Sequence, residues 1–473
     1  MPPPKPPSRV LEPDARALRS LIDTCAEFVV QQIDSLPRQP SWDTEGAAEV
    51  AAGFREAAPE QGSDLAGILE RLGPAIAKSF NTAGPGYLAY IPGGGLPSAA
   101  MADFIACAVN RFVGVAAAAP VLARIEATTI DWLAAAMGYP STAGGILTSG
   151  GSISNLTALI TARMARLSED FLRGTIYLSE QTHHSVARAA RLAGFPERAV
   201  RIVPVDARLR LRAADLEAMI RADRADGRQP FLVIANIGTT NTGAVDPLPE
   251  ILQVARRHDL WVHADAAYGG FFRLAPGGDR LMPGIEDCDS ITIDPHKGLF
   301  LPYGTGCLLV RDPALLKAAH HGGGDYFQDL HEAEVAPDFH SLSPELSRDF
   351  RGLRIWLPIV LHGLSVFREQ IREKLDLARG AWEVLRAAPF LEMIDEPQLS
   401  IVAFAGKPRR GDRNAFAAEL LRRVNARRRV FLSSTTLGGR FVIRICVLSF
   451  RTHAEQMRLA VEAILEEGQA LDA

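Results

Sequence analysis

The sequence has few cysteines, and their spacing indicates neither a metal centre nor a disulfide framework. Five occur in 473 residues, an odd number, at Cys25, Cys107, Cys288, Cys307 and Cys446. The number is low and odd, and the positions show neither metal-ligand nor paired spacing. We therefore expect a reducing compartment and no bound metal.

Long apolar runs and concentrated positive charge are also missing. No stretch approaches the roughly 20 apolar residues of a membrane-spanning helix. The proline-rich opening, residues 1–8, is not a cationic stretch followed by an apolar signal core. The net charge is -4, without the concentrated basic block that nucleic-acid binding needs. We expect a cytoplasmic protein whose partners are neither membranes nor nucleic acids.

Apolar residues make up 47% of the chain, enough to bury a large core in two or three domains. Seven short apolar runs alternate with helical patterns, a combination typical of a mainly parallel sheet covered on both faces. They are the run from Gly145, Thr175 to Leu178, Val200 to Val205, Phe231 to Ala235, the runs from Trp261 and Ser290, and Cys307 to Val310.

Helical and mixed segments flank this α/β region. Residues 1–80 predict an amphipathic helical arm, and residues 81–352 a large domain. Residues 353–473 combine helices with strand-like runs at 400–404, 430–432 and 441–447, as in a small α+β domain. Glycines from Gly322 and prolines through Pro344 predict a mobile loop at about 321–346.

A lysine follows one of the apolar runs. Ser290 to Ile293 is β-branched and apolar, and Asp294, Pro295, His296 and Lys297 come directly after it. A lysine held at a strand end in a partly dry cleft can lose its proton and condense with a carbonyl. A lone lysine there is more often simply solvated.

An acid ends the preceding apolar run. Asp265 follows Trp261 to Ala264, and the small Ala266 and Ala267 would let a flat ring lie against the backbone. Such a carboxylate can pair with a protonated ring nitrogen. The alternatives are a helix cap or a buried structural ion pair.

A glycine- and serine-rich turn lies further upstream. The run from Gly145 to Thr148 is followed by Ser149 to Ser152, and then by an apolar-periodic helix. Backbone amides at such a helix start bind phosphate well. Many helices begin this way, so the turn indicates a phosphate site only in combination with the acid and the lysine that follow it.

Five ordered motifs, between about Asn81 and about Arg451, resemble the group II pyridoxal-phosphate-dependent amino acid decarboxylases, the family of the aromatic L-amino acid decarboxylases. They are residues 147–152, 179–185, 237–240, 263–268 and 294–297. The resemblance implies a fold-type I enzyme, a pyridoxal 5'-phosphate cofactor and a homodimer in which the N-terminal arm packs against the second subunit.

The resemblance also implies roles for individual residues. Lys297 would form the Schiff base with the cofactor, and Asp265 would bind the pyridine nitrogen. His183, chosen over His184 by alignment of the motif, would stack over the ring, and Thr240 would lie near the substrate. The phosphate would be held by Gly151 and Ser152, with help from His296.

Within the predicted loop, Tyr326 matches the tyrosine that protonates the α-carbon after carbon dioxide leaves. The resemblance therefore favours a decarboxylase that forms an amine over an aldehyde synthase, where phenylalanine would be expected. An aminotransferase, another lyase, or a silent cofactor-binding protein fits the motifs less well.

The side chain of the substrate is less determined. The resemblance places Tyr90, Ile91, Pro92 and Phe112 in an apolar pocket, with Phe112 reaching in from the partner subunit. Arg348 would fasten the loop or a substrate carboxylate. We expect an aromatic or large apolar amino acid.

The sequence departs from the aromatic enzymes at several positions. Thr82 and Gly298 stand where those enzymes have tryptophan, and Asp294 stands where they have asparagine. With Gly114, the loss of the tryptophan at Thr82 equally allows a differently shaped pocket for an unusual biosynthetic amino acid.

Overall fold

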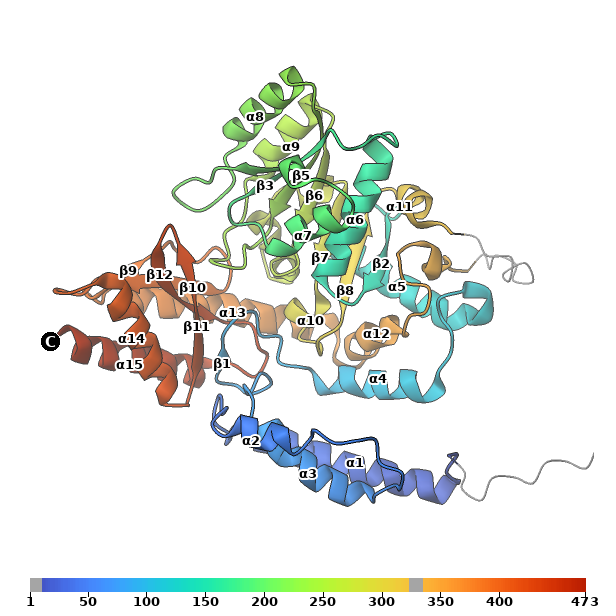
Figure 1. Ribbon diagram of the computed structural model, residues 1–473, viewed down its shortest axis with the longest axis vertical. Coiled ribbons are helices and arrows are strands. Elements are labelled where there is room, and N and C mark those ends of the chain that lie inside the picture. Colours follow the sequence, from blue (N-terminus) through green and yellow to red (C-terminus); the bar gives the residue numbers. More distant parts are fainter. Residues whose placement is uncertain (1–10, 323–334) are drawn as a thin grey trace, which may run out of the picture.

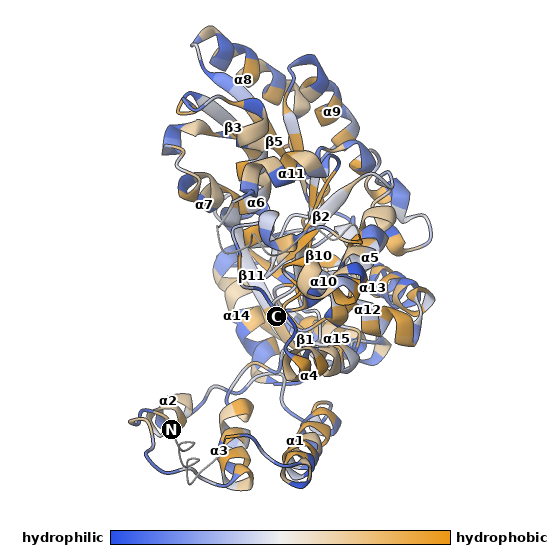
Figure 2. Ribbon diagram, turned by 90° about the vertical axis from the view of Figure 1, so that its right-hand side faces the viewer, coloured by the Kyte–Doolittle hydropathy of each residue, from blue (hydrophilic) through white to orange (hydrophobic). Residues whose placement is uncertain are grey.

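The computed structural model describes residues 11–322 and 335–473, whose strands form two sheets (Figure 1). Three helices come first and stand apart from the sheets in Figure 2: α1 (Ala15–Ser35), α2 (Ala47–Ala52) and α3 (Leu65–Ala77). The predicted proton donor, Tyr326, lies outside the described residues.

The larger sheet has seven strands in the order β2-β8-β7-β6-β5-β3-β4. Strands β3 to β7 run parallel to one another, and β8 is antiparallel to both β2 and β7. The prediction of a mainly parallel seven-stranded sheet is confirmed. The strands are β2 (Gly144–Thr148), β3 (Gly174–Ser179), β4 (Val200–Val203), β5 (Gln229–Asn236), β6 (Trp261–Asp265), β7 (Ser290–Ile293) and β8 (Gly306–Val310).

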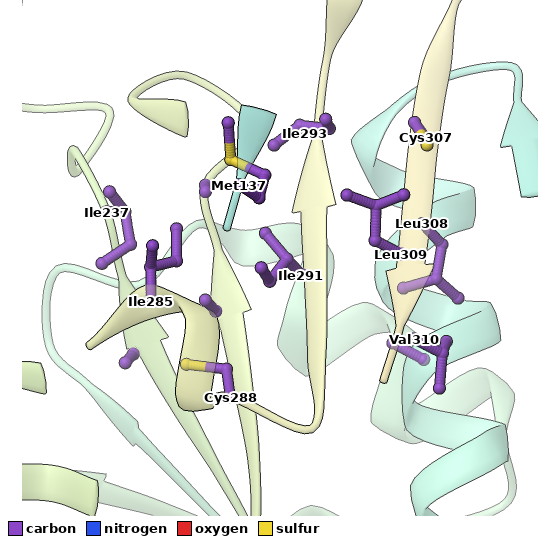
Figure 3. Close-up of a cluster of buried hydrophobic side chains, with 14 of the residues drawn as sticks. Met137, Ile237, Ile285, Cys288, Ile291, Ile293, Cys307, Leu308, Leu309 and Val310 are labelled. Atoms are coloured by element: carbon purple, nitrogen blue, oxygen red, sulfur yellow. The ribbon is translucent and has the colours of Figure 1, made fainter. Parts of the chain in front are cut away.

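Helices cover this sheet, and its central strands are therefore buried along almost their whole length. Helix α6 crosses β2, β5, β6, β7 and β8 and packs on α7 and α11. Figure 3 shows part of the core, where Ile291 of β7 and Leu309 of β8 lie in the same buried cluster as Met137 and Ile285. The helices of this region are α4 (Pro97–Val109), α5 (Pro120–Ala136), α6 (Gly151–Arg166), α7 (His184–Leu192), α8 (Ala213–Ala225), α9 (Leu248–Arg257) and α11 (Pro313–His320).

The second sheet has the order β1-β11-β12-β10-β9 and is built mainly from the C-terminal part of the chain. It consists of β1 (Tyr87–Leu88), β9 (Leu391–Met393), β10 (Ile401–Gly406), β11 (Phe431–Leu437) and β12 (Arg440–Cys446). Helices α13 (Leu364–Leu385), α14 (Arg413–Ala426) and α15 (Ala454–Asp472) complete this part, whereas α12 (Arg351–His362) packs on α4 and α5 of the first region. The short strand β1 pairs with β11, so a segment of the predicted large domain contributes to this sheet.

Other elements differ from the sequence expectations at their ends. Strand β4 stops at Val203, and Val205 forms an isolated bridge with Leu211. Helices α12 and α13 are separated at Gly363, whose φ of 77° is a left-handed conformation that glycine adopts without strain. No helix of the described residues is long and apolar enough to cross a membrane.

Lys297 lies one turn beyond its strand, in the short helix α10 (Pro295–Gly298). Pro295 occupies the first turn of α10, where its missing N–H leaves no helical hydrogen bond unmade. The Lys297 amide then donates to the Asp294 carbonyl at 2.8 Å. The strand therefore brings the lysine to the sheet edge, and the helical turn sets its direction.

Gly298, which ends α10, packs against a fully buried phenylalanine. A Cβ at this position would lie 2.5 Å from Cβ of Phe271, closer than two carbon atoms can approach. The same contact excludes a tryptophan here, which accounts for one departure from the aromatic decarboxylases.

We predict that Gly298→Ala destabilises the protein by about 1–3 kcal/mol, because the added methyl group overpacks this contact. The measurement is the midpoint of thermal unfolding. The control is Gly380→Ala within α13, where an added Cβ meets nothing within 4 Å and alanine favours the helix. A Gly298→Ala midpoint equal to or above that of the wild type would contradict this packing.

Candidate active site

A cavity of about 240 Å³ opens at the carboxyl ends of the parallel strands. All eight residues predicted to contact the cofactor line it: Gly151, Ser152, His183, Thr240, Asp265, Ala267, His296 and Lys297. His184, the alternative to His183, is not among the lining residues. The structure therefore brings together residues that are up to 146 positions apart in the chain.

The parallel strands explain this convergence. His183 and Thr240 follow β3 and β5, Asp265 is the last residue of β6, and Lys297 follows β7. These four strands are neighbours in the order β7-β6-β5-β3, so their carboxyl ends meet at one edge.

The N-terminus of α6 forms one wall of the cavity. Its N-cap, Gly150, makes no side-chain capping bond, and the first amides of a helix have no partner within the helix. A Cβ on Gly151 would lie 2.9 Å from Oδ2 of Asp294, so glycine lets the Asp294 carboxylate approach the start of the helix. The His296 ring lies nearby, 3.5 Å from the position of a Cβ on Gly150, with its Nδ1 2.6 Å from the Thr305 carbonyl oxygen.

Lys297 is paired with a buried acid. Its Nζ lies 2.8 Å from Oδ2 of Asp294, whose side chain is 2% exposed. Oδ1 of Asp294 has no hydrogen-bond partner among the described residues. The pair holds the lysine amine in the cavity and leaves one buried acceptor unsatisfied, which marks the site as polar and incomplete.

Asp265 is held by two donors. Oδ1 accepts from the Ala267 amide at 3.2 Å, and Oδ2 accepts from Nδ2 of Asn155 at 2.9 Å. These two bonds fix the orientation of the Asp265 carboxylate in the cavity wall, at the end of β6.

His183 caps α7 and is neutral near pH 7. Its Nδ1 lies 2.8 Å from Oγ of Ser185 and accepts from the Ser185 amide at 3.3 Å. Burial lowers the pKa of His183 below its usual value, and the nearby Asp265 opposes this shift. Burial lowers the pKa of His296 as well.

The second sheet holds the Thr240 segment. Arg444 of β12 donates to the carbonyls of Thr240 and Asn241, and it also bonds Oγ of Ser433 at 3.1 Å. Tyr268 joins the sheets from the other side, with its hydroxyl 2.8 Å from Oγ of Ser400. The position of Thr240 thus depends on residues more than 200 positions later in the chain.

None of the seven residues predicted for the substrate pocket lines this cavity. Thr82 instead lines a groove of about 580 Å³ among α1, α3 and α4. Tyr90 and Phe112 are exposed, Ile91 is half-buried and Pro92 is buried. Gly114 is buried, and its carbonyl accepts from the His340 amide at 3.0 Å.

Arg348 is committed to a buried ion pair. Its Nη1 lies 2.6 Å from Oε1 of Glu126, with both side chains fully buried, and its Nη2 donates to the Leu147 carbonyl. This arrangement does not leave the guanidinium for a substrate carboxylate in the cavity. Arg348 instead fastens the segment that follows the predicted loop to α5 and β2, which is closer to the expected role of holding the loop.

The cavity is also lined by several polar residues for which the sequence pattern predicts no role. Among its lining residues are Asn155, Ser185, Asn236 and Asp294. Asn155 lies one turn after Gly151, on the same face of α6, so its helical spacing is the signal that places it at the cavity. Asn236 is the last residue of β5, the position that Asp265 holds in β6.

The donors in this cavity fit a pyridoxal phosphate. The helix N-terminus suits its phosphate, Asp265 its protonated ring nitrogen, and Lys297 its aldehyde. No cluster of three or more histidines, cysteines or acids able to hold a metal occurs in residues 11–322 and 335–473.

Comparisons with known proteins agree with this site. Residues 48–407 match the pyridoxal-dependent decarboxylase conserved domain. The chain is 34% identical to an aromatic-L-amino-acid decarboxylase of Bacillus atrophaeus, over 97% of this chain and 98% of that protein. The crystal structure of Oryza sativa TDC with PLP and tryptamine aligns with a TM-score of 0.93 at 27% identity, covering 98% of this chain and all of that chain.

A crystal structure of Rhodiola rosea 4-hydroxyphenylacetaldehyde synthase also aligns, with a TM-score of 0.89 at 25% identity over 97% of this chain and 99% of that one. Similarity along nearly the whole chain, together with the cavity that its motifs form, leads to one conclusion: the chain belongs to the pyridoxal-dependent decarboxylase family.

Proposed function

We propose that this protein decarboxylates an L-amino acid with an aromatic or large apolar side chain, releasing the amine and carbon dioxide. The observation that carries the proposal is the single cavity that contains Lys297, Asp265 and the N-terminus of α6. The similarity to aromatic-L-amino-acid decarboxylases supports the reaction and the substrate class.

Bound through Lys297, pyridoxal phosphate would supply an electron sink for the electron pair that remains when carbon dioxide leaves. Asp265 would pair with the ring nitrogen and keep it positive. The amides of Gly151 and Ser152, with His296, would hold the phosphate, and the neutral His183 would lie against the ring. Ala267 would give the ring room against the backbone, and Thr240 would lie beside the substrate.

Tyr326 donates the proton to the α-carbon in this proposal, and the loop at about 321–346 excludes water when the substrate is bound. Thr82, Tyr90, Ile91, Pro92, Phe112 and Gly114 shape the substrate side of the site in the assembled enzyme. The second candidate function is an aldehyde synthase, which follows decarboxylation with oxidative deamination. The similarity to the 4-hydroxyphenylacetaldehyde synthase structure is the observation in its favour.

The assembled enzyme is a cytoplasmic homodimer in this proposal, with an arm of residues 1–80 and domains of 81–352 and 353–473. Helices α1 and α3 have no buried residue in the single chain, although each carries an apolar stripe. Figure 2 shows apolar residues on α1, α3 and α4. Exposed members include Leu18, Leu21, Val30, Ile33, Ile68, Leu72, Phe104 and Ile105. Patches of this extent usually mark protein interfaces.

We predict that pyridoxal phosphate binds covalently at Lys297 and raises the midpoint of thermal unfolding, because it binds the folded state alone. Reduction with borohydride followed by peptide mass spectrometry should place the label on Lys297. Lys297→Ala should abolish the covalent label and keep weaker binding, because Asp265 and α6 remain. The control, Lys407→Ala, changes an exposed lysine outside the cavity. A label on another lysine would contradict the site.

We predict that the loaded enzyme releases carbon dioxide and a stoichiometric amine from aromatic L-amino acids, without ammonia. The assay offers aromatic, branched, acidic and basic L-amino acids and records carbon dioxide and ammonia together. Tyr326→Phe should raise the share of aldehyde and ammonia, because the proton donor is lost. Equal amounts of ammonia and carbon dioxide from the wild type would favour the aldehyde synthase instead.

We predict a mass near twice 51.1 kDa by light scattering. The double variant Leu21→Glu with Ile68→Glu should shift the protein toward the monomer, because it places charges in the apolar faces of α1 and α3. Ser20→Glu, at an exposed polar position of α1, is the control. A wild-type mass near 51.1 kDa would rule out the dimer.

A further inference from the structure

Asn155 connects residues on two walls of the cavity. Its side chain projects from the second turn of α6, and the residue is only 4% exposed. Nδ2 donates to Oδ2 of Asp265 at 2.9 Å and to Oγ of Ser185 at 3.3 Å. Both hydrogens of this amide group therefore have acceptors within reach.

The amide oxygen of Asn155 faces a buried histidine. Nε2 of His263 lies 3.1 Å from Oδ1 of Asn155, and Nδ1 of His263 lies 2.8 Å from Oγ of Ser290. Nε1 of Trp261 donates to the same serine oxygen at 2.8 Å. Trp261, His263 and Asp265 alternate along β6, so their side chains share one face of the sheet.

The chemistry of the two end groups fixes the direction of these hydrogen bonds. An indole N–H can only donate, so Ser290 accepts from Trp261 and gives its own hydrogen to Nδ1 of His263. His263 then carries its proton on Nε2 and donates to Asn155, with Oγ1 of Thr292 at 3.3 Å as a second neighbour. Asn155 must therefore turn its amino group to Asp265, whose carboxylate can only accept.

A second branch of these hydrogen bonds leads from Asn155 to His183, the residue predicted to stack over the cofactor ring. Ser185 accepts from Asn155, and its Oγ lies 2.8 Å from Nδ1 of His183. With the Ser185 hydroxyl and amide both directed at Nδ1, that nitrogen accepts and Nε2 carries the proton. Asn155 is therefore bonded both to Asp265 and to the serine whose hydroxyl and backbone amide fix the tautomer of His183.

The chain of bonds requires both histidines to be neutral. Burial lowers the pKa of His263 to about 4, and it lowers the pKa of His183 too. A proton on Nδ1 of His263 would leave Ser290 facing two donors, with no acceptor for its own hydrogen. The hydrogen bonds are therefore stable at neutral pH, and each group from Trp261 to Asp265 donates to the next.

We propose that Asn155 and His263 are positioning residues that hold the Asp265 carboxylate toward the pyridine nitrogen of the cofactor, and that Asn155 also holds the Ser185 hydroxyl against Nδ1 of His183. The first part rests on the proposed function, and the second concerns the protein alone. Without Asn155, Asp265 loses a donor in a buried place, where a missing partner is costly. The pyridine nitrogen would then be protonated less completely.

The test uses two measurements on the full-length protein. Nitrogen NMR of the cofactor-free protein, with labelled histidine, reports which ring nitrogen of His183 and His263 carries the proton. Nitrogen NMR of the protein loaded with pyridoxal phosphate, labelled at its ring nitrogen, reports the protonation of that nitrogen between pH 6 and 9. A fluorescence titration gives the dissociation constant of pyridoxal phosphate.

In the wild type we expect Nε2-protonated His183 and His263 and a protonated ring nitrogen. Asn155→Leu and His263→Leu should weaken cofactor binding roughly tenfold, as expected for one lost hydrogen bond to a buried charge. Both should also lower the pH at which the ring nitrogen loses its proton. His263→Gln should restore both properties, because its amide N–H can replace the Nε2 donor.

The control is Thr161→Val on the same helix, which removes the hydrogen bonds of Thr161 to the Thr157 carbonyl and to Nε2 of His320. None of these residues belongs to the series of hydrogen bonds from Trp261 to Asp265. This variant should leave the ring nitrogen and the histidine tautomers unchanged. The proposal is overturned if Asn155→Leu and His263→Leu titrate like the wild type or no differently from Thr161→Val. Nδ1-protonated His183 or His263 in the wild type would also overturn it. A wild type with the expected tautomers but no cofactor binding would refute the proposed function and support the hydrogen-bonded chain.

Discussion

The hydrogen bond from Asn155 to Asp265 is the interaction on which the site depends most. Asp265 is a charged group with 8% exposure at the end of a buried strand, and such a group needs donors. The Ala267 amide provides one within the same strand end, and Asn155 provides the other from α6. Because the same helix forms the anion site with its first turn, the position of α6 ties the two halves of the cavity together. The remaining groups are arranged around this contact.

The second sheet contributes to the site without lining much of it. Arg444 holds the carbonyls after β5, and the Tyr268 hydroxyl meets Ser400 at the start of β10. Burial raises the pKa of Tyr268, so this hydroxyl stays neutral and serves as a hydrogen-bonding group. Arg444 also lies 3.5 Å from the Tyr90 carbonyl, so one guanidinium contacts both the segment before α4 and the Thr240 segment. Residues of the second sheet and its flanks therefore hold the loops that follow β5 and β6.

Local patterns predicted the residues whose chemistry is visible at a strand end. Lys297, Asp265 and Gly151 each follow or end an apolar run, and parallel strands bring such positions to one edge. The partners of these residues could not be predicted in this way. Arg348 meets Glu126 across 222 positions, and strand β1 has two residues, too few to show alternation. The substrate residues stayed undetermined because Phe112 and Tyr90 face outward in a single chain.

The cofactor cavity is separate from the groove that Thr82 lines, and this separation affects how sequences can diverge within the family. The cofactor contacts come from the carboxyl edge of one sheet, whereas Thr82 lies in a groove against the N-terminal helices. Replacing side chains around that groove leaves the hydrogen bonds of Asp265 and Lys297 untouched. Side chains around that groove can therefore vary without disturbing the contacts that the cofactor cavity needs.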